Sequence, residues 1–394
     1  MRTTFTASLA PLSAALTAAL VGFGGTVALI VQLGEAAGAS SLQVRSAVTA
    51  LCLGVALAGA GLSAALRLPV VLAWSTPGAA LVAASATGVG DKAVGYPVVV
   101  GAFVVAALLM VAVGLVPALG RLAERIPAGV AAALLAGVLL PFCLRLFVTL
   151  ESAPLVTGLL IVTYLLARRY RPTYALLAVL GAAAATVALR GEAALTAPYF
   201  GTLVATAPEF SVQAALSLGL PLFLVTLASQ NLPGFAVLRA AGYRPPPRPI
   251  LLVTGLTTLL LAPFGAHGVN LAAITAAICT GPEAHPDPAR RWRVGVLYAG
   301  FYLLLALFSA PLVGLFMTLP PETVAALTGL ALLAPLGGAL AGMLRAPEDR
   351  EATLLTFVTT ASGVVLFGIG SALWGLVAGF LALGVGRLGK RRGG

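Results

Sequence analysis

Long apolar stretches recur from one end of the chain to the other, separated by short polar segments. Of the 394 residues, 60% are hydrophobic and only 9% are charged, whereas a soluble domain carries about 25% charged residues. Inside a bilayer, backbone N–H and C=O groups without partners are costly, and helices bond their own backbone. The sequence therefore predicts a polytopic, all-α membrane protein.

The apolar stretches divide into fourteen expected transmembrane segments, two sets of seven. They are 9–33, 43–66, 76–88, 93–118, 127–148, 153–168 and 172–190, then 211–231, 248–263, 269–280, 292–317, 322–343, 351–368 and 371–388. With both termini cytoplasmic, 19 of the 23 lysines and arginines fall on the cytoplasmic side. If the two short segments, 76–88 and 269–280, were re-entrant and returned to the side of the membrane from which they start, the excess of lysine and arginine on the cytoplasmic side would be smaller. The positive-inside rule therefore favours full crossings. We attribute the net charge of +11 to these arginines and not to nucleic-acid binding.

The stretch Pro263–Gly281 does not fit an ordinary span. It reads P-F-G-A-H-G-V-N-L-A-A-I-T-A-A-I-C-T-G, with helix breakers first, then Asn270 as a candidate cap, then a run of small residues. A helix of about 11 residues is about 16 Å long, whereas the hydrocarbon core is about 30 Å thick. We therefore expect a half-helix that begins near the membrane midplane, where its N-terminal N–H groups favour an anion.

A second interrupted segment stands at the matching place in the first half. Ser75 or Thr76 can cap it, Pro77 suits its first turn, and Gly78 allows close approach to the backbone. We expect the two halves to form an inverted repeat, as in many transporters, with this helix end facing the one near Gly268–Asn270. The alternative is a pair of proline-kinked packing helices.

Four polar side chains are candidates for handling protons or substrate. His267 is the ionisable group expected near the midplane; it either carries a proton or bonds a carbonyl of the broken backbone. Gln230 and Asn231 either bind a carboxylate or satisfy that same backbone. Glu35 is a second candidate for proton handling.

Other chemistry has no support in the sequence. There is no P-loop, so we expect no direct use of ATP. Cysteine, histidine and carboxylate residues show no metal spacing, and no Ser/His/Asp arrangement stands out. We therefore expect no cofactor and no metal, and we do not expect an enzyme.

Three stretches resemble the benzoate:proton symporter family, BenE. They are L-A-W-S-T-P-G-A-A-L at 72–81, L-A-S-Q-N-L-P-G at 227–234, and P-F-G-A-H-G-V-N-L-A-A-I-T-A-A-I-C-T-G-P-E-A-H-P-D-P-A-R-R at 263–291. The resemblance runs through nearly the whole chain. It implies a UraA-like fold, shared with the SulP anion transporters, with substrate between half-helices three and ten.

The resemblance also implies an organisation in domains. The core domain would comprise 1–120 and 205–318, and the gate domain 121–192 and 319–394. Short strands would precede the two half-helices, at Val70–Trp74 and Phe264–His267. The related uracil transporters carry a glutamate on segment eight, where this chain has Gln230 and Asn231, so we expect His267 to carry the proton.

The predicted function is proton-coupled uptake of benzoate, or a related aromatic carboxylate, across the bacterial inner membrane by an elevator mechanism. The carboxylate would meet the half-helix N–H groups, with Ser75, Thr76, Gln230 and Asn270 adding hydrogen bonds; Trp74, Phe264 and the gate would supply an apolar wall. A nucleobase or inorganic-anion transporter of the same fold is the alternative, and a membrane enzyme or receptor is disfavoured. Related folds are often dimers, so a second copy of the chain is a candidate partner.

Overall fold

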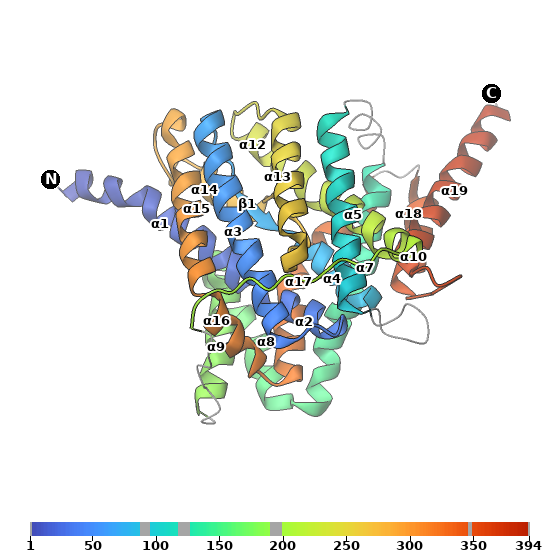
Figure 1. The fold of residues 1–394 in the computed structure, drawn as a ribbon, viewed down its shortest axis with the longest axis horizontal. Helices are drawn as coiled ribbons and strands as arrows, with labels where there is room; N and C mark the ends of the chain where they lie inside the picture. Colours follow the sequence, from blue (N-terminus) through green and yellow to red (C-terminus); the bar gives the residue numbers. More distant parts are fainter. Residues whose placement is uncertain (1, 87–94, 117–126, 190–198, 346–348, 393–394) are drawn as a thin grey trace.

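The computed structural model describes residues 2–86, 95–116, 127–189, 199–345 and 349–392. Helices make up nearly all of it, and two short strands lie near the centre (Figure 1). The expected domain boundaries near 120 and 192 fall outside the described residues, as do Lys92, Arg121, Arg125 and Arg190 of the charge count.

The first half of the chain contains one strand among its helices, and a short break divides segment one. Its elements are α1 (Arg2–Gly24), α2 (Val27–Ala36), α3 (Ser41–Leu66), β1 (Leu72–Trp74), α4 (Thr76–Ala86), α5 (Tyr96–Leu115), α7 (Ala128–Ser152), α8 (Pro154–Tyr170), the 3₁₀ turn η1 (Pro172–Tyr174) and α9 (Ala175–Leu189). The break between α1 and α2 lies at Gly24 and Gly25. Paired glycines weaken a helix, which accounts for its position.

The second half contains two π-helical turns, η2 and η3, and the second strand. Its elements are α10 (Val212–Ala214), η2 (Ala215–Gly219), α11 (Leu220–Thr226), η3 (Leu227–Asn231), α12 (Leu232–Ala240), α13 (Pro247–Leu261), η4 (Ala262–Phe264), β2 (Val269–Leu271), α14 (Ile274–Thr280), η5 (Pro288–Arg290), α15 (Trp292–Leu307), α16 (Ser309–Met317), α17 (Pro321–Met343), α18 (Arg350–Ala361) and α19 (Ser371–Arg392).

Eight helical stretches in the described residues are long and apolar enough to cross a membrane. A ninth is obtained if α15 and α16, which meet at an angle of 63°, form one broken span. The prediction of a polytopic helical membrane protein is confirmed at this level.

Segment eight was predicted to end at Asn231, and this is wrong. The helical path continues from Val212 through η3 to Ala240. Pro233 cannot donate to the carbonyl four residues before it, and the wider π turn just ahead accommodates it without ending the helix. Gln230 and Asn231 therefore lie within a helix and not at its end.

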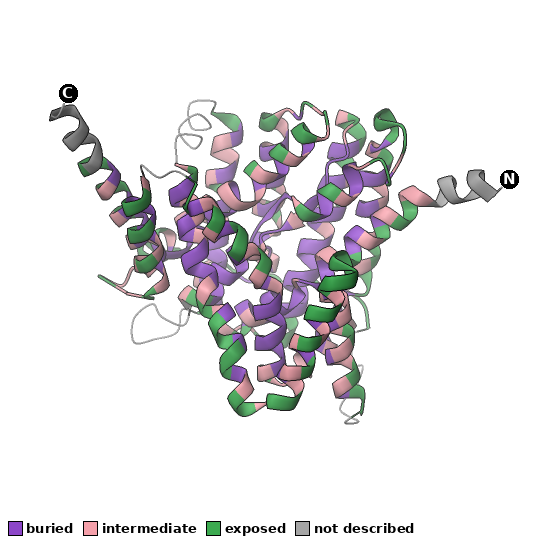
Figure 2. Cartoon of the chain, turned by 180° about the vertical axis from the view of Figure 1, so that it is seen from behind, coloured by how far each residue is buried: buried purple, intermediate pink, exposed green. Residues whose placement is uncertain are grey.

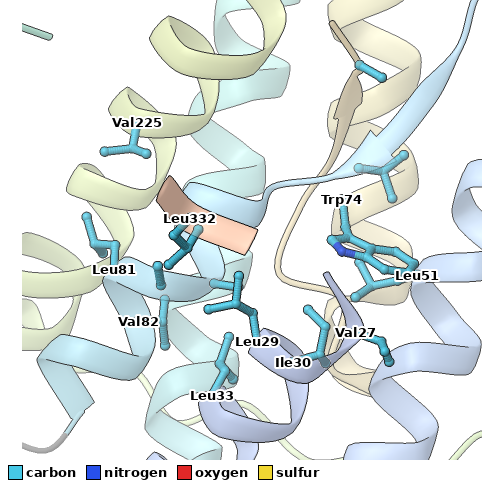
Figure 3. Packing of buried hydrophobic residues seen from close by; sticks show 14 of the residues in the cluster. Val27, Leu29, Ile30, Leu33, Leu51, Trp74, Leu81, Val82, Val225 and Leu332 are labelled. Carbon is cyan, nitrogen blue, oxygen red and sulfur yellow. The ribbon is translucent and has the colours of Figure 1, made fainter. Parts of the chain in front are cut away.

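Buried apolar side chains from both halves form one core around the strands (Figure 2). Within it, α17 packs on α7, α15 on α3, α13 on α5, and α18 on α19. An extended stretch, 199–210, crosses one face and is bonded to three distant segments: Gly201 N–H to Leu307 O, Thr206 N–H to Pro263 O and Glu209 N–H to Pro97 O. Side chains of α2, α4 and α17, including Leu29, Leu81 and Leu332, belong to the same core (Figure 3).

The chain turns sharply at Gly265, between η4 and β2. Its φ is +96°, in the left-handed region that favours glycine. A Cβ at this position would also clash with the Tyr96 hydroxyl and with Ala47. This turn fixes where α13 ends and where the strand segment begins.

Candidate functional site

The two broken segments meet as an antiparallel strand pair, with Trp74 opposite Val269, Ala73 opposite Asn270 and Leu72 opposite Leu271. Two further backbone bonds extend the pairing: Ser75 N–H donates to Gly268 O at 3.2 Å, and Ala272 N–H donates to Val71 O at 3.0 Å. The predicted partnership of the interrupted segments is therefore a direct contact.

The second strand lies at Val269–Leu271, so the predicted position, Phe264–His267, is wrong. The reason is that Phe264 still belongs to a 3₁₀ turn and Gly265 reverses the chain before extended backbone begins. The half-helix α14 correspondingly starts at Ile274, several residues later than expected, and Asn270 does not cap it. Because the strands are antiparallel, α4 and α14 begin at opposite ends of the pair.

Side chains from three helices satisfy the outward-facing backbone groups of the strands. Thr258 Oγ1 accepts from Val269 N–H at 2.9 Å, and Asn231 Oδ1 accepts from Leu271 N–H at 3.1 Å. The Tyr298 hydroxyl donates to Leu72 O at 2.8 Å. A membrane interior offers no water to replace these bonds.

Asn231 was expected either to bind a carboxylate or to satisfy the broken backbone, and its observed contact is with the backbone. Its side chain is fully buried, and its amide oxygen satisfies the broken backbone of segment ten. Sequence reasoning did not single out Thr258 or Tyr298, since a threonine or tyrosine in an apolar stretch has no pattern that reveals its partner.

The start of α4 is held by hydroxyl groups. Ser75 Oγ accepts from Gly78 N–H at 3.1 Å, so Ser75 is the predicted cap, and the Thr226 hydroxyl donates to the same oxygen at 2.8 Å. Ser75 is fully buried, whereas Thr76 is half-buried. A Cβ on Gly78 would meet the Leu222 side chain, so this glycine serves close packing of α11 on α4.

His267 joins the two broken segments. Its Nε2 lies 2.9 Å from Ser75 O, and only 1% of the residue is exposed. A carbonyl oxygen only accepts, so Nε2 carries a proton and Nδ1 of the neutral ring holds a free lone pair. Among the described residues Nδ1 has no hydrogen-bond partner. The Phe103 ring is the aromatic neighbour, with centroids 6.0 Å apart.

Asn270 presents a second unsatisfied acceptor in the same region. Its Nδ2 donates to Leu271 O at 2.9 Å, while its buried Oδ1 has no partner within the described structure. Gly268, between His267 and Asn270, has only ordinary van der Waals neighbours at its Cβ position: Ser75 Cβ at 3.5 Å and Thr226 Oγ1 at 3.9 Å. Two acceptors without donors thus lie on one short segment.

Gln230 is placed differently from its neighbour Asn231. It is half-buried on the π turn η3, and within the described structure its amide makes no hydrogen bond. Single π turns inside α-helices occur frequently at functional sites. Gln230 is therefore available to a ligand.

The two aromatic residues predicted for the apolar wall lie in different surroundings. Trp74 is 2% exposed and packs edge-on between Phe23, at 5.7 Å, and Tyr302, at 5.9 Å. Figure 3 shows it on the α3 side of the core, beside Leu51. Phe264 is half-buried in η4.

Glu35 is not part of the strand region. It is exposed at the end of α2 and lines a separate cavity that also contains Gln32 and Arg145. Across the described residues, no group of three or more His, Cys, Asp and Glu side chains could hold a metal ion.

Solved structures of other proteins share the overall fold of this chain. The structure described as the transmembrane domain of a cyanobacterium bicarbonate transporter, BicA, matches with a TM-score of 0.63 at 17% identity, covering 94% of this chain and 96% of that one. The structure of SLC26A9 matches with a TM-score of 0.61 at 13% identity, covering 96% of this chain and 65% of that one. These likenesses show the fold of the chain.

Sequence comparison identifies the family. The family model described as "Benzoate membrane transport protein" (BenE) matches residues 6–385. Inner membrane protein YdcO of Escherichia coli K12 is 40% identical over 364 residues, 92% of each chain. A benzoate membrane transport protein of Acinetobacter baylyi is 34% identical over 377 residues, 95% of this chain and 94% of that one. The chain belongs to the benzoate membrane transport family and is a transporter, not an enzyme.

Proposed function

We propose that the chain takes up benzoate, or a related aromatic carboxylate, together with a proton across the bacterial inner membrane. The observation that carries the proposal is the buried His267, which bonds one broken segment through Nε2 and keeps Nδ1 free. Family membership and the relatives' names support the substrate class and the membrane.

An inverted repeat of seven plus seven segments is supported by the helix contacts. In such a repeat each segment corresponds to the one seven places later, so contacts come in corresponding pairs. The packing of α3 on α15 has its counterpart in α13 on α5, and that of α8 on α9 in α18 on α19. The pairs β1–β2 and α7–α17 map onto themselves. This supports fourteen segments and the division into core and gate.

The substrate carboxylate would bind beside the start of α4. Thr76 and Gln230 are both half-buried, and neither side chain has a hydrogen-bond partner in the described structure. The N-terminal N–H groups of α4 favour a negative charge. Ser75, which immediately precedes α4, is bonded through its N–H to Gly268 O. The gate helices α7 and α17 are the candidates to cover the aromatic ring.

The proton would bind at His267 Nδ1. Protonation makes both ring nitrogens donors, so the ring keeps its bond to Ser75 O and gains a charge beside the carboxylate. Asn270 Oδ1 is a second free acceptor, and a protonated carboxyl group could donate to it. Glu35, in its separate cavity, remains the second candidate for proton handling.

Transport would follow an elevator movement of the core, with its paired strands, against the gate. Thr258 of α13 and Tyr298 of α15 are bonded to the strands, and Thr226 of α11 is bonded to Ser75, which follows the first strand. These bonds support a core in which the strand pair would move together with the three helices. The gate helices would supply a fixed surface along which the site passes.

The test is the initial rate of labelled benzoate uptake into proteoliposomes, with and without an inward proton gradient. Protein-free liposomes are the control, because the neutral acid crosses lipid unaided. We expect the proton gradient to stimulate uptake of labelled benzoate. Substituted benzoates should inhibit this uptake by competition, whereas uracil and sulfate should not. Competition by uracil or sulfate instead would assign the site to a nucleobase or an inorganic anion.

A further inference from the structure

A cavity that no residue of the strand pair lines lies between α2 and α4 on one side and α7, α17 and the segment that follows α18 on the other. Its volume is about 560 Å³, within the range of small-molecule sites. The second half of α4, from Leu81 to Ser85, lines it, whereas the first turn of α4 belongs to the strand site. The lining residue of α4 nearest to its start is Leu81, which is five residues from Thr76, or about 7.5 Å along the helix axis.

The lining contains two charged side chains, Arg145 of α7 and Glu35 of α2. Both are exposed, and they belong to opposite walls. In the described part of the chain, Arg145 forms no hydrogen bond and no ion pair, with Glu35 or with any other residue. A guanidinium group presents a fork of donors that matches a carboxylate. The cavity thus contains an available binding group for one carboxylate.

An apolar surface adjoins this cation. Phe142 precedes Arg145 by three residues, so the two side chains share one face of α7, about 4.5 Å apart along the helix axis. Pro141 lies beside Phe142, and Leu81 and Val324 face them from α4 and α17. This spacing suits a flat ring whose carboxylate is attached directly to it.

We propose that this cavity is a second binding site for the aromatic monocarboxylate, which the substrate occupies on its way to or from the strand site. Arg145 binds the carboxylate and Phe142 contacts the ring. Glu35, on the facing wall, repels a second negative charge and so disfavours dicarboxylates. The assignment rests on the proposed function, because it takes the same substrate class.

Transport kinetics give the first test. Arg145→Gln is expected to raise the KM for benzoate about tenfold and leave kcat within about twofold, since one charge-assisted contact in an access site is lost. The KM of Arg145→Lys should lie between that of the wild type and that of Arg145→Gln. Arg169→Gln, which removes an exposed arginine of α8 that does not line the cavity, is the matched control and should match the wild type. An unchanged KM in Arg145→Gln would overturn the proposal.

Thiol labelling of the full chain in detergent gives a second test that requires no transport. The three native cysteines are buried, so Ser85→Cys, on the cavity lining, introduces an accessible thiol. Benzoate should slow the labelling of this introduced thiol, and the effect should disappear when Arg145→Gln is added. Phthalate, a dicarboxylate, should slow the labelling of this thiol only in a variant that also carries Glu35→Gln.

The outcomes separate the two proposals. If benzoate fails to protect the thiol of the Ser85→Cys variant although the protein takes up benzoate, the second site is refuted and the proposed function stands. Protection that survives Arg145→Gln also refutes it, because the cation would then have no part. If benzoate is neither taken up nor protective, the substrate class is wrong and both proposals fail.

Discussion

His267 offers the sharpest test, because its two ring nitrogens have different surroundings. Nε2–H donates to Ser75 O at 2.9 Å in a site that is 1% exposed, while Nδ1 is unpartnered among the described residues. A glutamine places an amide N–H about where Nε2–H stands, but it cannot take up a proton. His267→Gln therefore separates a structural role from a proton-carrying role.

The structural part has an expected magnitude. His267→Ala leaves the buried Ser75 carbonyl without a partner, which costs about 1–3 kcal/mol, and creates a cavity in addition. His267→Gln keeps the bond and should cost less than about 1 kcal/mol. The melting temperature in detergent should therefore be highest for the wild type, lower for His267→Gln and lowest for His267→Ala.

The functional part is measured in proteoliposomes. His267→Gln should still exchange labelled for unlabelled benzoate across the membrane, since exchange needs no net proton movement. It should show no stimulation by an inward proton gradient. If His267→Gln responds to the gradient as the wild type does, His267 does not carry the proton, and the free Nδ1 has no role in coupling.

Three further substitutions test the site. Asn231→Ala should destabilise the protein by about 1–3 kcal/mol, seen as a lower melting temperature, because Leu271 N–H loses its acceptor inside the membrane. Gln230→Leu should leave the melting temperature unchanged and raise the KM for benzoate about tenfold; a lower melting temperature would show that its amide serves the fold. Gly265→Ala should sharply reduce folded protein in detergent size-exclusion chromatography, because φ is +96° and its Cβ would clash with Tyr96.

The sequence alone determined the class of protein. Hydrophobic segment lengths and the distribution of arginines are local properties, so they predicted a polytopic helical membrane protein without any tertiary information. The breakers around His267 and the Ser75–Gly78 run are equally local; both segments are interrupted as predicted, and Ser75 caps the first half-helix.

Placement within the broken segments was less predictable. Extended backbone at Val269–Leu271 exists because it pairs with Leu72–Trp74, and a strand three residues long has no periodicity that a sequence reveals. The helix through Asn231 likewise continues past Pro233 only because a π turn absorbs the proline.

Only the tertiary structure decided which polar groups are used by the fold and which remain free. Asn231 and Gln230 are neighbours with the same functional group, yet one is bonded to Leu271, 40 residues away, and the other has no partner in the described structure. The same holds for Arg145, which lies opposite Glu35 and is unpaired within the described residues. Whether a donor finds its acceptor depends on how distant helices pack, and that is a property of the assembled fold, not of any stretch of sequence.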